Sequence, residues 1–157
     1  IPNIQLVLGG KISKYTNPLD EADEIGVNHL LEFVGWIPVD KIPSYIYSSD
    51  ICFHVPPVYN EEVNRTIQTK IYQYIKMGKP LIVGQARMAR EKKKKNQLGF
   101  SIKENDSGDF ADKVLKMYKD PDLYNTLSNN CKNTAKKYSW EKTIQSLINF
   151  YKKALYE

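Results

Sequence analysis

The 157-residue chain has the length of one domain, with 41% hydrophobic and 26% charged residues. This balance excludes a disordered chain as the default, and no apolar run approaches the roughly 20 residues that span a bilayer. The formal net charge of +5 suits an anionic partner, such as a phosphate-bearing ligand, nucleic acid or a membrane surface, but selects none of them.

Short apolar runs bounded by turn residues predict the strands. They lie at residues 4–8, 30–34, 51–55, 81–83 and 100–102. Most are apolar throughout rather than alternating, which is typical of parallel strands covered on both faces.

Apolar stripes at helical spacing fill the gaps between these runs and continue after the last one. The predicted helices lie near residues 42–46, 66–77 and 110–118, after Asp120, and from Ser139 onward. Asp120 and the proline after it form an N-cap and a first helical turn. Strands that alternate with helices predict an α/β fold: a Rossmann-like, doubly wound parallel sheet with helices on both faces. We expect a single domain over residues 1–157.

In such sheets, ligands bind beyond the carboxyl ends of the strands. Gly9 and Gly10 follow the first predicted strand and let a backbone approach closely, although a lone Gly-Gly pair is a weak signal. Trp36 and Ile37 follow the second strand. The P-loop pattern is absent, which argues against a nucleotide hydrolase of that type.

The loop after the third predicted strand leads into a helix that we expect to begin near residues 64–66, capped by Asn64 or Thr66. The N–H groups of its first turn favour a phosphate. Arg65 and Lys70 would add positive charge there.

The two cysteines and two histidines show no zinc-ligand spacing. Cys52 lies in an apolar run, where a thiol behaves as a small hydrophobe. His29 and His54 flank predicted strands, and we interpret both as structural. We therefore expect no metal site and a reducing, cytoplasmic location.

An ordered set of motifs resembles the C-terminal domain of family 4 glycosyltransferases, which have the two-domain GT-B fold. The motifs are LVLGG at 6–10, FVGWI at 33–37, IPSY at 42–45, SDI at 49–51, Pro56, TKIYQYIKMGKPLIV at 69–83, and YSW at 138–140 before an amphipathic helix with Tyr151. The resemblance covers almost the whole chain in order, so it is more specific than any single motif.

The resemblance implies the C-terminal, donor-binding half of a GT-B fold, which holds a UDP- or GDP-sugar for retaining transfer to a saccharide or lipid-linked acceptor, without a metal. It implies the base near Trp36 and Ile37, the ribose at Gln73, and the pyrophosphate near Arg65 and Thr66. The acceptor would bind mostly to a separate N-terminal domain. That domain, and a first strand with basic phosphate ligands, are expected to precede Ile1, and the final helix is expected to contact that domain.

Two positions depart from the family pattern. The glutamate of its signature is Gln73 here, and a second glutamate, eight positions earlier, is Arg65. Glu61 and Glu62 lie near that position but do not align with it. These departures leave open a divergent or inactive relative.

Residues 92–95 are four consecutive lysines. A charge run usually forms a solvated face, and attraction to anionic lipid, giving peripheral membrane contact, is the functional alternative. A nucleotide-sugar epimerase with the same fold and a non-catalytic α/β binding module stay open as alternatives. Nucleic acid is disfavoured as a partner because no aromatic residue interrupts the lysines.

Overall fold

The computed structural model describes residues 1–12, 17–56, 65–85, 87–104 and 106–156. Its elements run in the order β1 (Leu6–Gly9), α1 (Pro18–Glu24), the 3-10 helix η1 (Asn28–Leu30), β2 (Leu31–Gly35), α2 (Ile42–Ser48), β3 (Cys52–His54), α4 (Thr69–Lys76), β4 (Leu81–Val83), α5 (Arg87–Asn96), β5 (Gly99–Ser101), α6 (Ser107–Lys119), α7 (Pro121–Ala135) and α8 (Trp140–Tyr156). The chain divides into two compact units, Ile1–Tyr45 and Ile46–Glu157.

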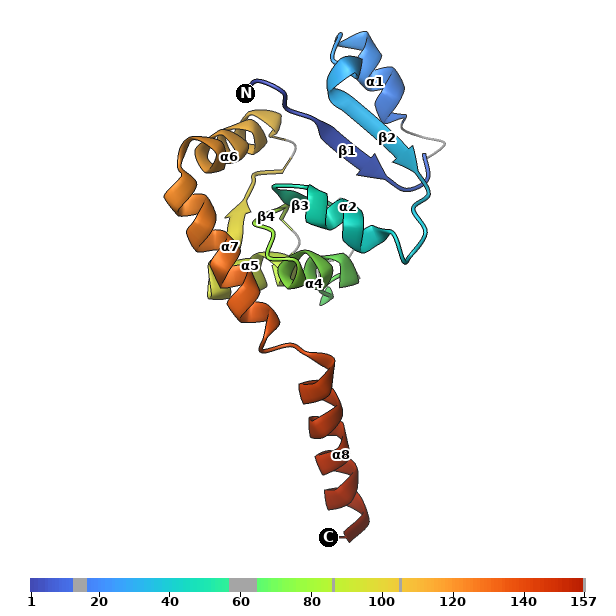
Figure 1. Cartoon of the computed structure of the whole chain (residues 1–157), viewed down its shortest axis with the longest axis vertical. Helices are drawn as coiled ribbons and strands as arrows, with labels where there is room; N and C mark the ends of the chain where they lie inside the picture. Colours follow the sequence, from blue (N-terminus) through green and yellow to red (C-terminus); the bar gives the residue numbers. More distant parts are fainter. Residues whose placement is uncertain (13–16, 57–64, 86, 105, 157) are drawn as a thin grey trace. The chain divides into compact units, whose positions relative to one another are not determined.

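In the first unit, β1 and β2 form a parallel pair, and α1 lies against β2 (Figure 1). Leu6 pairs with Leu31, and the register shifts between Leu8 and Gly9. Strand β1 is less covered than the other strands, because Leu6 and Val7 are each 40% exposed. Both α1 and η1 contact β2.

In the second unit, the parallel strands lie in the order β3-β4-β5. The central strand β4 is fully buried, as its three apolar residues predict. Ile82 packs with Met117 of α6 and Leu127 of α7 in one core cluster. Because successive side chains of a strand alternate between faces, Leu81 and Val83 point to the opposite face. Each such buried aliphatic side chain contributes roughly 1.5–3 kcal/mol.

Local sequence explains where α7 begins and where α4 ends. The Asp120 carboxylate accepts a hydrogen bond from the Leu123 N–H at 2.9 Å, and Pro121 follows as the first helical residue, as the sequence predicts. The end of α4 is set by Gly78, whose φ of +69° suits glycine. The carbonyl of Gly78 accepts a hydrogen bond from the buried Ser128 hydroxyl of α7 at 2.8 Å, which ties α4 to α7.

The lysine run forms the last part of α5 and is not a uniformly solvated face. Lys92 is only 9% exposed. Its Nζ lies 3.2 Å from the ring centroid of Tyr138 and 5.0 Å from that of Tyr72, within the range of cation–π attraction. Lys94 and Lys95 are exposed. The expectation of a solvated face therefore holds for these two lysines but not for Lys92.

The final helix, α8, begins one residue after the predicted start, and the Ser139 carbonyl accepts the first hydrogen bond, from the Thr143 N–H at 3.2 Å. Its predicted apolar stripe is exposed: the exposed fractions run from 37% for Ile144 to 74% for Leu155. No helix in the described ranges combines the length and the apolar content needed to cross a bilayer.

Candidate functional site

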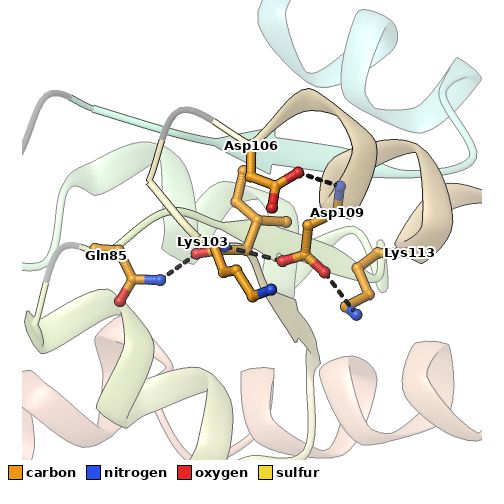
Figure 2. Close-up of polar contacts among 6 residues, drawn as sticks. Gln85, Lys103, Asp106, Asp109 and Lys113 are labelled. Atoms are coloured by element: carbon orange, nitrogen blue, oxygen red, sulfur yellow. Dashed lines mark hydrogen bonds and ion pairs between the residues drawn. The ribbon is translucent and has the colours of Figure 1, made fainter.

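The carboxyl ends of the three strands in the second unit form one edge of the sheet, where backbone hydrogen bonds connect neighbouring strands. The Gly84 N–H donates to the His54 carbonyl at 2.9 Å, and the Ile102 N–H donates to the Val83 carbonyl at 3.0 Å. A Cβ at Gly84 would lie 3.2 Å from the Val55 Cα, so glycine permits the close approach of β4 to the end of β3. The Gln85 amide also donates to the Ile102 carbonyl, as Figure 2 shows.

At the end of β3, His54 belongs to a hydrogen-bonded chain that leads to α4. His54 Nε2 lies 2.9 Å from Gln68 Oε1, and Gln68 Nε2 donates to the Thr66 hydroxyl at 3.2 Å. His54 is half-buried. Burial lowers its pKa, the bond to Gln68 opposes this effect, and the charge of Lys70 lowers the pKa further. The imidazole is therefore neutral at pH 7.

The predicted start of the signature helix is wrong by several residues, because α4 begins at Thr69. The N-cap is Gln68, whose side chain makes no capping bond. The Thr66 hydroxyl instead accepts the bond from Gln68, so Thr66 is not the cap. Asn64, the other predicted cap, lies outside the described residues. Arg65 and Thr66 are exposed and precede the helix, while Lys70 is in its first turn.

Gln73 lies in the second turn of α4 and is half-buried. The buried stripe of the helix consists of Ile71 and Ile75, so Gln73 lies off this stripe. Its backbone carbonyl accepts a hydrogen bond from the Met77 N–H at 3.1 Å. Packing of the helix on the sheet therefore does not require a glutamine side chain at this position.

The segment after β5 is fixed by the carboxylate of Asp109, which no sequence motif indicates (Figure 2). Asp109 accepts a hydrogen bond from the Lys103 N–H at 2.9 Å and pairs with Lys113 at 2.9 Å. Its own N–H donates to Asp106 at 2.7 Å, and Asp106 is the N-cap of α6. The bond with Lys113, followed by that from Lys103, lowers the pKa of Asp109. Lys103 is thereby held where β5 ends.

In the first unit, the structure brings together the candidate residues that follow β1 and β2. The Gly10 N–H donates to the Gly35 carbonyl at 2.7 Å. A Cβ at Gly9 would lie 2.4 Å from the end of the Ile37 side chain, so this side chain would have to move to admit any larger residue. Trp36 is 71% exposed, and Lys11 Nζ lies 5.6 Å from its ring centroid. Exposed aromatic surface beside a cation suits a nucleobase joined to phosphates.

Among the residues that the structure describes, no three His, Cys, Asp or Glu side chains are grouped so that they could hold a metal ion. Glu61 and Glu62 lie outside the described residues. Gln68, Gln85 and Lys103 were not recognised from the sequence. A signal existed for the last two, because each lies two residues beyond the end of a strand.

Comparison with known proteins identifies the family. The model of the family described as glycosyl transferases group 1 matches residues 1–137. No curated protein sequence matches the chain significantly.

Many solved structures share the fold, among them the following three. HepE from Anabaena, solved in complex with UDP, superposes with a TM-score of 0.80 at 20% identity, over 98% of this chain and 42% of HepE. Sucrose-phosphate synthase from Thermosynechococcus elongatus gives a TM-score of 0.76 at 18% identity, over 96% and 38%. WaaG, a glycosyltransferase involved in lipopolysaccharide biosynthesis, gives 0.70 at 16%, over 86% and 34%.

The chain therefore spans less than half the length of each of these structures. Their likeness confirms the predicted α/β fold, which is Rossmann-like and of the GT-B type. Because the family model covers most of the chain, the chain belongs to the glycosyl transferases group 1.

Proposed function

We propose that the chain is the donor-binding part of a hexosyltransferase that takes a UDP- or GDP-sugar and transfers the sugar, with retention and without a metal ion, to a saccharide or lipid-linked acceptor. The observation that carries the proposal is the family match over residues 1–137. Support for the donor class comes from HepE, a structure of the same fold solved with UDP, with UDP and glucose, and with UDP-glucose.

In this proposal, the residues that follow β1 and β2 bind one part of the donor, and the residues near the start of α4 bind another. The base stacks near Trp36 and Ile37, with Gly9 and Gly10 allowing close backbone approach. The diphosphate binds near Arg65, Thr66 and the amino end of α4, where helix N–H groups and the positive charge of Lys70 favour an anion.

The ribose is assigned to Gln73, which has an amide where the family signature has a carboxylate. An amide oxygen accepts a neutral hydrogen bond from a ribose hydroxyl, which is worth about 0.5–1.5 kcal/mol, whereas a bond to a charged group is worth about 1.5–3 kcal/mol. Arg65 stands where the family often has a sugar-contacting glutamate, so an arginine at this position would contact the diphosphate instead.

A further domain is part of the proposal, because transfer needs donor and acceptor to be held together. An N-terminal domain that binds the acceptor would cover the exposed apolar stripe of α8. The chain alone should therefore bind the donor but not transfer the sugar. We place the protein in the cytoplasm, with membrane contact through exposed lysines, such as Lys94 and Lys95, where the acceptor is lipid-linked.

Calorimetric titration with UDP-glucose and with GDP-mannose, at one salt concentration, tests the donor site. Lys70→Met should weaken binding about three- to tenfold, because it removes a charge from the proposed diphosphate site. Lys119→Met removes an exposed charge from the last turn of α6 and is the matched control. The absence of binding by either nucleotide sugar, or equal losses in both variants, would refute this assignment.

The same titration with Gln73 variants tests the ribose contact. Gln73→Glu should tighten binding about three- to tenfold and Gln73→Ala should weaken it by a similar factor. Unchanged affinity in both variants would remove Gln73 from the site. Binding of polynucleotides that falls steeply with salt, without binding of nucleotide sugars, would instead favour a nucleic-acid-binding module.

A further inference from the structure

The hydrogen bonds of His54 determine which of its ring nitrogens carries the proton. Gln68 uses its amide N–H to donate to Thr66, so its oxygen faces His54. An amide oxygen only accepts, and Nε2 of the neutral His54 must therefore be the donor. The other ring nitrogen, Nδ1, is then the one that can take up a second proton. Protonation there keeps the bond to Gln68, because both nitrogens of an imidazolium are donors.

In the absence of a bound anion, the surroundings of His54 disfavour protonation of its Nδ1. Burial lowers the pKa of His54, and the charge of Lys70, in the first turn of α4, acts in the same direction. In the neighbouring strand β4, the residue that pairs with His54 is the uncharged Val83. Among the described residues, Lys70 is the charged group whose effect reaches the imidazole. An added anion would reverse this balance, both by its own charge and by neutralising Lys70.

We propose that His54 is a positioning residue of the donor site, which takes up a proton when a nucleotide-sugar diphosphate binds at the amino end of α4. This inference rests on the proposed function. His54 acts through Gln68, the N-cap of α4. The imidazolium donates a stronger, charge-assisted bond to Gln68 than the neutral ring does. It thereby fixes the start of the helix whose N–H groups face the diphosphate.

The sign of the pH effect follows from linkage. A bound anion raises the pKa of His54, so binding takes up a proton. The gain in affinity is fully present below the pKa of the free protein, and it is lost as the pH rises through the pKa of the complex. An opposite charge within about 6 Å moves a pKa by about one unit or more. UDP-glucose should therefore bind more tightly at pH 5.5 than at pH 8, by up to about tenfold for a shift of one unit.

Calorimetry with UDP-glucose at these two pH values, in buffers of different ionisation enthalpy, measures both the affinity and the protons taken up. UDP-glucose is the probe because its pyrophosphate is esterified at both ends and does not titrate in this range, whereas a terminal phosphate has a pKa near about 6. His54→Gln keeps an N–H donor toward Gln68 but has no titrating group, so its affinity should not depend on pH. His29→Gln is the control, because His29 lies in η1, before β2, and it should retain the pH dependence.

A second measurement does not depend on the folding of any variant. NMR titration of the wild-type protein follows the His54 ring resonance, which should titrate at a higher pH with saturating UDP-glucose than without it. Equal affinity at the two pH values, no proton uptake, or an unchanged His54 titration would overturn the inference and leave the proposed function standing. Absence of UDP-glucose binding at every pH would overturn both.

Discussion

Lys92 offers the sharpest test of how a lysine-rich helix is held in this fold. Its ammonium lies 3.2 Å from the Tyr138 ring centroid, well within the roughly 6 Å limit for cation–π attraction. Such a contact is worth about 0.5–1 kcal/mol at an exposed site and about 2 kcal/mol when desolvated. Lys92 is 9% exposed and Tyr138 is 47% exposed. We therefore expect a coupling energy of about 1–2 kcal/mol between these two side chains.

A double-mutant cycle measures this coupling, because Lys92→Met alone also relieves the desolvation of a buried ammonium. The cycle combines Lys92→Met, Tyr138→Leu and the double variant, each followed by urea unfolding with an unchanged slope against denaturant. Methionine keeps most of the aliphatic stem of lysine, so packing is largely preserved. For a chain of this size, 1 kcal/mol corresponds to about 2–4 °C in Tm.

The control is the same cycle with Lys94→Met, since Lys94 is on the same helix but exposed. Its coupling to Tyr138 should stay within about 0.3 kcal/mol. A coupling between Lys92 and Tyr138 of that same small size would refute the reasoning. The lysine would then be buried only for its aliphatic stem.

Three further outcomes are expected. Gly99→Ala should destabilise the fold by about 2–4 kcal/mol in urea unfolding, because a Cβ there collides with the backbone of β4 and φ is +149°. Gly108→Ala, in the first turn of α6, should instead stabilise the fold by about 0.5–1 kcal/mol. Equal effects of the two substitutions would contradict this reasoning. Asp120→Ala should lose about 1 kcal/mol of stability, and Asp120→Asn much less, since asparagine also caps helices; equal losses would show that the cap bond is not the cause. Asp109→Asn should remove a stabilisation that exists above about pH 4 and disappears as the pH falls through the lowered pKa of Asp109. If the wild-type protein stayed more stable than the variant at acidic pH, the bonds of Asp109 to Lys113 and to the loop would not be the cause.

The fold could be predicted from the sequence where local chemistry and burial agree. Strand β4 was located to the residue, because three apolar residues stand between Pro80 and Gly84 and all three are buried. The start of α7 followed from Asp120 and the proline after it. Both signals are local, so no knowledge of distant contacts was needed.

The predictions of the helix cap and of the lysine run failed because the side chains involved contact residues that are distant in the sequence. Asn64 or Thr66 was expected to cap the signature helix, but the Thr66 hydroxyl accepts a hydrogen bond from Gln68. The Gln68 oxygen in turn lies against His54, a residue 14 positions away. Nothing in the spacing of these residues indicates that contact. The burial of Lys92 could not be predicted for a similar reason, since four consecutive lysines do not indicate which of them is buried. The donor-site residues Gly9, Gly10, Trp36, Ile37, Arg65, Thr66 and Gln73 stay predictions until binding is measured.

The two buried thiols have a consequence for how this protein can be studied. Cys52 lies in β3 and Cys131 in α7, and burial raises the pKa of both, that of Cys131 to about 12. Because the thiolate is the reactive form, neither cysteine should be alkylated while the second unit is closed. The rate of modification by a neutral thiol reagent then reports how often the region between β3 and α7 opens. Comparing the two sites would distinguish local fraying from concerted opening of the whole unit.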